Sequence, residues 1–98
     1  MKLPKSFEVM GQKISVKYVK DLAQHGAVGL YNHFEKTIYI QTHLDGKALS
    51  KDVQMSTYYH ELMHCVFSYL NYNEDNSNEQ KVDTIGALLH QVHKTVSS

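Results

Sequence analysis

Residues 60–64 read His-Glu-Leu-Met-His, two histidines four positions apart with a glutamate directly after the first. In a helix, side chains four positions apart share a face and lie about 6 Å apart along the axis, so both imidazoles can reach one metal ion. Glu61 is rotated by about 100° from His60, which lets its carboxylate reach a water molecule on that metal. The spacing therefore predicts two zinc ligands, His60 and His64, and a carboxylate that takes a proton from the bound water.

A second motif lies downstream and can complete this metal site. Catalytic zinc sites usually have three protein ligands and one water. Glu79 and Asp83 stand one helical turn apart in the segment 78–83. Glu79 can supply the third ligand, and Asp83 can accept the free ring N–H of a ligating histidine and so fix the orientation of that ring. Both acids would also suit the first turns of an ordinary helix, and His60 and His64 could be ordinary surface histidines. The presence of both motifs in one chain favours a metal site over these alternatives.

The two motifs, H-E-x-x-H and N-E-x-x-x-D, resemble those of the gluzincin metallopeptidases, the thermolysin-like branch of the zincins. The resemblance implies a zinc-dependent peptidase in which His60, His64 and Glu79 bind one zinc ion per chain. It implies that Glu61 is the general base and later the proton shuttle, and that Asp83 is the hydrogen-bond partner of His60. Length and element order are similar to those of the minimal gluzincins, and small phage-encoded zincin-like proteins have a similar layout.

The sequence departs from the large gluzincins in one respect that concerns catalysis. We expect no counterpart of their C-terminal lobe, which supplies a histidine or tyrosine to stabilise the transition state. The developing oxyanion needs a donor besides zinc, and the candidates here are His90, His93 and Tyr72. His90 lies about 16 Å along the helix axis from Glu79, so a ligand set with His90 in place of Glu79 is a rival that would need a bent helix.

The elements that position these residues follow from hydrophobic periodicity. Alternating and β-branched segments predict strands at residues 7–9, 14–18, 27–31 and 37–41. Ser50 suits the N-cap of a helix at about 51–71. A polar loop is expected at 72–77, followed by a second helix at about 78–96. That second helix has an expected core stripe of Val82, Ile85, Leu89, Val92 and Val96, and Gly86 is expected to allow close helix packing.

These elements predict the fold class α+β. A small, mostly antiparallel sheet of three to four strands is expected to pack against the active-site helix, with a second helix at the C-terminus. The 98 residues fit one minimal zincin-like domain, 1–98.

Partners and location follow from composition and from the resemblance. Residues 37–41 resemble the edge strand on which zincins align an extended substrate, so a peptide or protein substrate is expected there. The formal net charge is zero and there is no basic face, which argues against nucleic acid as a partner. No signal peptide or membrane span is evident. Cys65 is the only cysteine, so a cytoplasmic location is expected, in the host if the chain is phage-encoded.

Two functions besides peptidase activity stay open at this point. The chain could be a zincin-fold binding module whose metal site is structural or vestigial. It could also hold a closed structural site with four protein ligands, which would need a residue such as His93 as the fourth. The missing C-terminal lobe favours the binding module, whereas the intact Glu61 disfavours it, because a purely structural site has no use for a general base. A metal-bound water would argue against the closed site.

Overall fold

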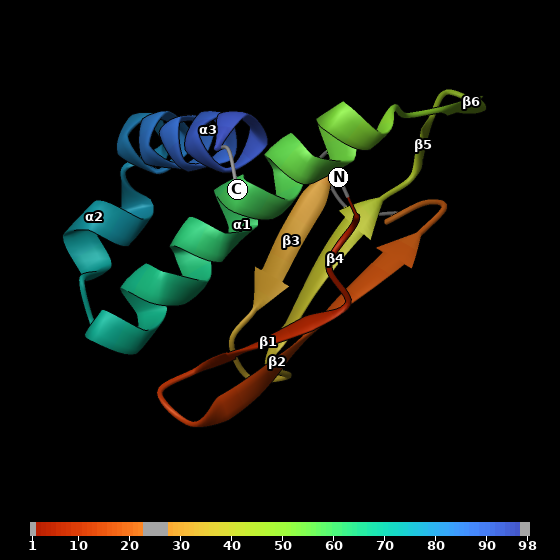
Figure 1. Ribbon diagram of the computed structural model, residues 1–98. Helices are drawn as coiled ribbons and strands as arrows, with labels where there is room; N and C mark the ends of the chain where they lie inside the picture. The colour runs from red at the N-terminus through yellow and green to blue at the C-terminus, as the bar shows by residue number, and fades with distance from the viewer. Residues whose placement is uncertain (1, 23–27, 97–98) are drawn as a thin grey trace.

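The computed structural model describes residues 2–22 and 28–96 and has an α+β fold, as predicted (Figure 1). Its elements are the strands β1 (Ser6–Val9), β2 (Gln12–Val19), β3 (Gly29–Asn32), β4 (Thr37–Gln41), β5 (His43–Leu44) and β6 (Lys47–Ala48), followed by the helices α1 (Lys51–Leu70), α2 (Asn73–Ser77) and α3 (Glu79–Thr95). Helix α1 contacts β3 and β4 on one side and α3 on another, so it lies between the sheet and the last helix.

Strands β1 to β4 form one mixed sheet in the order β1-β2-β4-β3. β1 and β2 are joined at Met10 and Gly11, whose φ angles of 50° and 79° suit a two-residue hairpin turn. β2 runs parallel to β4, and β3 pairs antiparallel with β4 on its other side. The strand predicted at 27–31 corresponds to β3, although residue 27 lies outside the described part of the chain.

The prediction that residues 37–41 form an edge strand is wrong. β4 lies between β2 and β3, and its residues Ile38 and Ile40 are fully buried. The strongly β-branched composition that marks this segment reflects burial inside a sheet. The edge next to α1 is β3, whose shorter and less apolar sequence gives a weaker signal.

Helix α1 begins where its cap predicts. The Ser50 hydroxyl accepts a hydrogen bond from the Val53 N–H at 3.1 Å, and Asn71 ends the helix in the left-handed conformation. Its sheet-facing side joins the strands in the main core, which consists of Ile14, Val16, Ile38, Ile40, Met55, Tyr58, Tyr59 and Cys65.

Helix α3 packs on α1 at a close crossing. Its buried residues are Val82, Gly86 and His90. A Cβ atom added to Gly86 would lie 3.1 Å from the backbone N of His60 and the backbone O of Tyr59, so the two helix backbones meet there and the expected role of Gly86 is confirmed.

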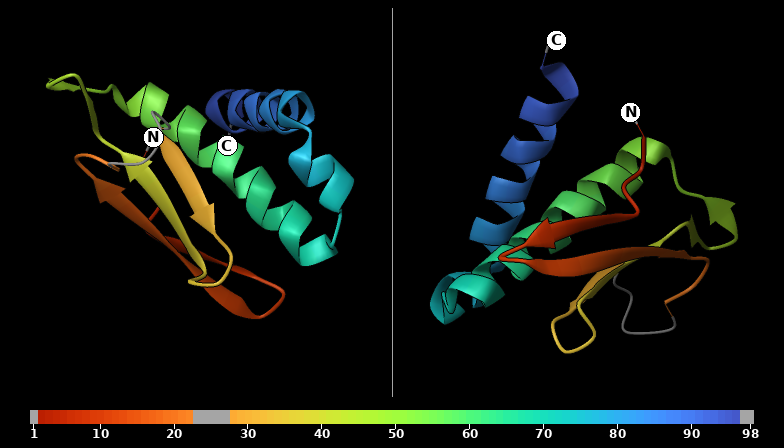
Figure 2. Two further views of the ribbon diagram at one scale, coloured as in Figure 1. Left: turned by 180° about the vertical axis from the view of Figure 1, so that it is seen from behind. Right: turned by 60° about the horizontal axis from the view of Figure 1, so that its bottom comes forward.

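The predicted core stripe of α3 is wrong at its C-terminal end. Leu89, Val92 and Val96 are 40%, 65% and 68% exposed. Helix α3 crosses α1 at an angle in Figure 2 (right), and its C-terminal half still contacts α1 through His90, His93 and Lys94. These residues lie on a face of α3 next to the apolar stripe, so Leu89, Val92 and Val96 are turned away from α1.

The connection between α1 and α3 also differs from the prediction. Residues 73–77 form the short helix α2 where a polar loop is expected, and α2 contacts both α1 and α3. No helix in the described ranges is both long and apolar enough to cross a membrane.

Candidate metal centre

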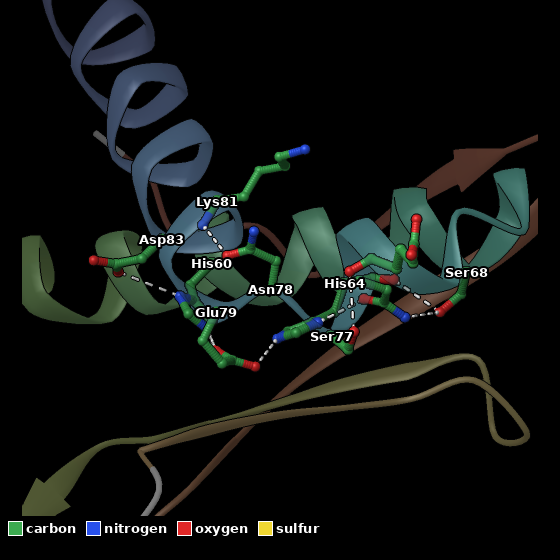
Figure 3. A network of polar contacts seen from close by, with 10 residues as sticks. His60, His64, Ser68, Ser77, Asn78, Glu79, Lys81 and Asp83 are labelled. Atoms are coloured by element: carbon green, nitrogen blue, oxygen red, sulfur yellow. Dashed lines mark hydrogen bonds and ion pairs between the residues drawn. The ribbon is translucent and has the colours of Figure 1, made fainter.

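The structure brings His60 and His64 of α1 together with Glu79 in the first turn of α3 (Figure 3). The Nε2 atom of His60 lies 3.2 Å from Oε2 of Glu79, and the Nε2 atom of His64 lies 3.2 Å from Oε1. Two ligand atoms bound to one zinc ion at tetrahedral angles would lie about 3.4 Å apart. The donor atoms are therefore spaced as they would be around a single ion.

A chain of hydrogen bonds fixes the tautomer of His64. The Ser68 hydroxyl donates to the backbone carbonyl of His64 at 2.8 Å, so its oxygen is left to accept from the Asn76 amide N–H at 3.2 Å. That contact turns the Asn76 carbonyl oxygen toward Nδ1 of His64, 2.7 Å away. Because an amide oxygen can only accept, Nδ1 of His64 donates, and in the neutral ring Nε2 presents a lone pair toward Glu79.

His60 has an acidic partner in the corresponding place. Oδ1 of Asp83 lies 3.4 Å from Nδ1 of His60, on the side of the ring away from Glu79. With Nδ1–H directed at Asp83, Nε2 of His60 also presents a lone pair to the Glu79 carboxylate. Two lone pairs and a carboxylate aimed at one point repel each other unless a cation lies between them. Two imidazole nitrogens and one carboxylate oxygen are a donor set that suits zinc.

Asn76 is the residue of this site that the sequence does not reveal. It lies in the segment 72–77, whose composition predicts only a polar loop. The short helix α2 carries its amide to the end of α1, twelve positions from His64. Sequence holds no periodic or motif signal for such a contact, because it depends on how α2 folds back.

Glu61 lies beneath the edge strand, beside the two histidines. It is 8% exposed, and a Cβ atom added to Gly29 of β3 would lie 3.0 Å from Cγ of Glu61 and 2.5 Å from Cγ2 of Thr57. Gly29 therefore allows β3 to approach α1 closely over the carboxylate. Burial raises the pKa of Glu61, and the neighbouring His64 and His60 partly oppose that rise.

Two pockets meet at the metal centre, and both are lined by Gly29, His60 and Glu61. One, of about 400 Å³, extends past Tyr31 and His33 toward the C-terminal end of α1. The other, of about 260 Å³, extends in the opposite direction and is further lined by Val28, Ser56, Thr57 and Asp83. Together they form a groove between β3 and α1, here called the β3 cleft.

The three residues expected to donate to an oxyanion do not line the β3 cleft. The ring of His90 is buried and stacks on Tyr59, and the Nδ1 atom of His93 is paired with the hydroxyl of Tyr59. Tyr72 is half-exposed with its ring against Phe67. Both histidines contact Tyr59 outside the β3 cleft, so neither His90 nor His93 has the position of a ligand or an oxyanion donor.

Comparisons of the chain with protein-family models, with curated proteins and with solved structures find no match. The case for a metal site therefore rests on the convergence of His60, His64 and Glu79, the only such group of potential ligands among the described residues. The case for chemistry at the site rests on Glu61, which is largely buried and lines the same cleft.

Proposed function

We propose that the protein is a zinc-dependent peptidase of the gluzincin type. The observation that carries the proposal is the convergence of two imidazole Nε2 atoms and the Glu79 carboxylate in a cleft that Glu61 also lines. Three protein ligands leave the fourth position of a tetrahedral zinc site for water. A purely structural site would gain nothing from placing a buried carboxylate beside that position, whereas hydrolysis requires one.

The residues around the site would have distinct roles in hydrolysis. Bound zinc supplies a water of lowered pKa and polarises the scissile carbonyl. Glu61 would accept a proton from that water while the water oxygen attacks the carbonyl carbon. Glu61 would then deliver the proton to the amine nitrogen as the C–N bond breaks. Asp83 and Asn76 hold the imidazole rings of His60 and His64 by their Nδ1 atoms. A raised pKa for Glu61 favours proton uptake by its carboxylate.

The substrate is proposed to lie along β3, in place of the strand 37–41. β3 pairs only with β4 within the described sheet, so its outer edge faces the cleft. The Tyr31 backbone N–H on this strand donates to Glu61, and the remaining backbone groups of the outer edge can pair with another strand. An extended peptide added there would pass directly over Glu61, because Gly29 brings the strand within contact of that side chain.

One observation favours the alternative of a binding module without catalysis. His90, His93 and Tyr72, the candidate donors to an oxyanion, all lie outside the β3 cleft. A chain that binds zinc and a peptide but lacks a second donor would hold a partner without cleaving it. The position of Glu61 supports the peptidase in preference to this alternative.

We further propose that the protein acts in the cytoplasm. Cys65 is the only cysteine and its side chain is fully buried in the main core, so it needs no oxidising environment. Fractionation of cells that produce the protein would check this location.

The peptidase proposal is tested by incubating the zinc-loaded protein with a mixture of defined peptides and following cleavage by mass spectrometry. We expect cleavage that stops when the metal is removed by a chelator and returns when zinc is restored. Cleavage that continues without metal would contradict the proposal. Peptide binding without cleavage by the zinc-loaded protein would replace it with the binding module.

A further inference from the structure

Four side chains gather at the end of the β3 cleft that lies beyond His64. They belong to the C-terminal part of β3, to the turn that follows it and to the last turns of α1, and are here called the turn cluster: Tyr31, His33, Lys36 and Tyr69. His33 and Tyr31 line the same pocket as the metal ligands. In Figure 3 the β3–β4 hairpin turns beside the Ser68 end of α1, which places the cluster at one end of the cleft.

Lys36 is held in place without being neutralised. Its Nζ atom lies 4.9 Å from the centre of the Tyr69 ring and 3.4 Å from Nε2 of His33. Lys81 and Lys94 each bind an aspartate, but in the described part of the chain Lys36 forms no ion pair with an acidic side chain. A half-buried cation that is fixed by an aromatic ring and an imidazole keeps its charge available to a ligand.

The acid next to Lys36 in the chain is directed elsewhere. The carboxylate of Glu35 accepts a hydrogen bond from the Tyr39 hydroxyl at 2.7 Å. Side chains alternate along a strand, and Ile38 of β4 lies in the core against α1, so Tyr39 points to the opposite face of the sheet. Glu35 is therefore tied to that opposite face, away from the cleft.

The charge of the turn cluster comes from Lys36 and not from His33. Burial, and then the proximity of Lys36, lower the pKa of His33, which favours the neutral ring. If Nε2 of His33 accepts from the Lys36 ammonium, its Nδ1–H donates to the hydroxyl oxygen of Tyr31. Tyr31, His33 and Lys36 thus form a chain of hydrogen bonds that ends in one fixed positive charge. Tyr69 contributes its ring, and its buried hydroxyl has no hydrogen-bond partner among the described residues.

We propose that the turn cluster selects substrates that carry an acidic side chain two or three residues before the scissile bond. The inference rests on the proposed peptidase function. From Gly29, which touches Glu61, to His33 is four residues, or about 13 Å along an extended strand. A peptide that runs antiparallel to β3 passes this end first, and the side chain of its second or third residue before the bond spans the remaining distance to Lys36.

The test uses zinc-loaded Glu61→Gln protein, immobilised and exposed to a random heptapeptide mixture, so that binding is measured without cleavage. We expect captured peptides to be enriched about threefold in aspartate and glutamate, the size of effect typical of one partly exposed ion pair. Adding Lys36→Glu should reverse the preference toward lysine and arginine. Because lysine and glutamate both carry a Cβ atom, this change adds no new cost at the left-handed backbone of residue 36 (φ 54°).

Lys47→Glu in the β5–β6 hairpin is the matched control, an exposed charge reversal outside the cleft. It should leave the acidic preference intact. Wild-type protein cleaving the same mixture should place the acid at the second or third residue before the cleaved bond. Cleavage without any acidic preference would overturn the turn-cluster proposal and leave the peptidase standing. Zinc-loaded protein that neither captures nor cleaves peptides would overturn both.

Discussion

The variant Glu61→Gln is expected to lose at least about a hundredfold of its peptide hydrolysis while keeping one zinc ion per chain, because general acid–base catalysis typically contributes that much or more. Glutamine has nearly the shape of glutamate but cannot take a proton from water. His60, His64 and Glu79 supply the ligand atoms, so the metal site does not depend on residue 61. Hydrolysis and zinc content measured on the same preparation would separate the two roles.

Unfolding would not account for the loss of activity in this variant. Glu61 is 8% exposed, and burial raises its pKa because the charged form is costly to bury. The neutral glutamine removes that cost, so thermal unfolding should occur at or above the wild-type temperature. Turnover that matches the wild type would contradict the role of Glu61 as the general base.

The variant Gly86→Leu is expected to destabilise the fold by about 1–3 kcal/mol and to weaken zinc binding, although residue 86 touches no metal ligand atom. A Cβ at this position already lies 3.1 Å from the backbone of His60 and Tyr59, and backbone atoms cannot move aside as side-chain ends can. A larger side chain must push α3 away from α1. Glu79 lies on the same helix and would move away from His60 and His64.

Ala87→Leu is the matched control for this prediction. Residue 87 adjoins Gly86 on α3 but is exposed, so the same side chain fits there without contact with α1. Gly86→Ala separates two effects: alanine regains about 1 kcal/mol of helix propensity, which offsets part of the crowding. Chemical denaturation and zinc titration of the three variants would measure both quantities. Equal stability and equal zinc affinity of Gly86→Leu and Ala87→Leu would show that the close crossing does not position Glu79.

Local signals in the sequence predict much of the fold. Ser50 caps α1 where predicted, and the fold class is α+β as expected. The position of strand 37–41 within the sheet could not be predicted, because it depends on the parallel pairing of β2 with β4. The β-branched composition of a segment predicts that it forms a strand but not which strands pair with it. The exposure of Val92 and Val96 could not be predicted either, since it depends on which face of α3 packs on α1.

The candidate site divides in the same way. The spacing of His60, Glu61 and His64 is a property of one helix, so it is readable from the sequence. The convergence of Glu79 on these histidines is suggested by a motif but decided by the crossing at Gly86. The hydrogen bond between His64 and Asn76 depends on the position of α2, which no pattern in the sequence predicts.

The central claim is tested most directly by the zinc content of the purified protein, measured by elemental analysis at neutral pH for the wild type, Glu79→Ala and His90→Ala. The structure predicts close to one zinc per wild-type chain, a large loss with Glu79→Ala, and no change with His90→Ala, because His90 packs on Tyr59 away from the metal centre. Wild-type protein that holds no zinc even when zinc is supplied, or zinc that survives Glu79→Ala and is lost with His90→Ala, would contradict the proposed metal site.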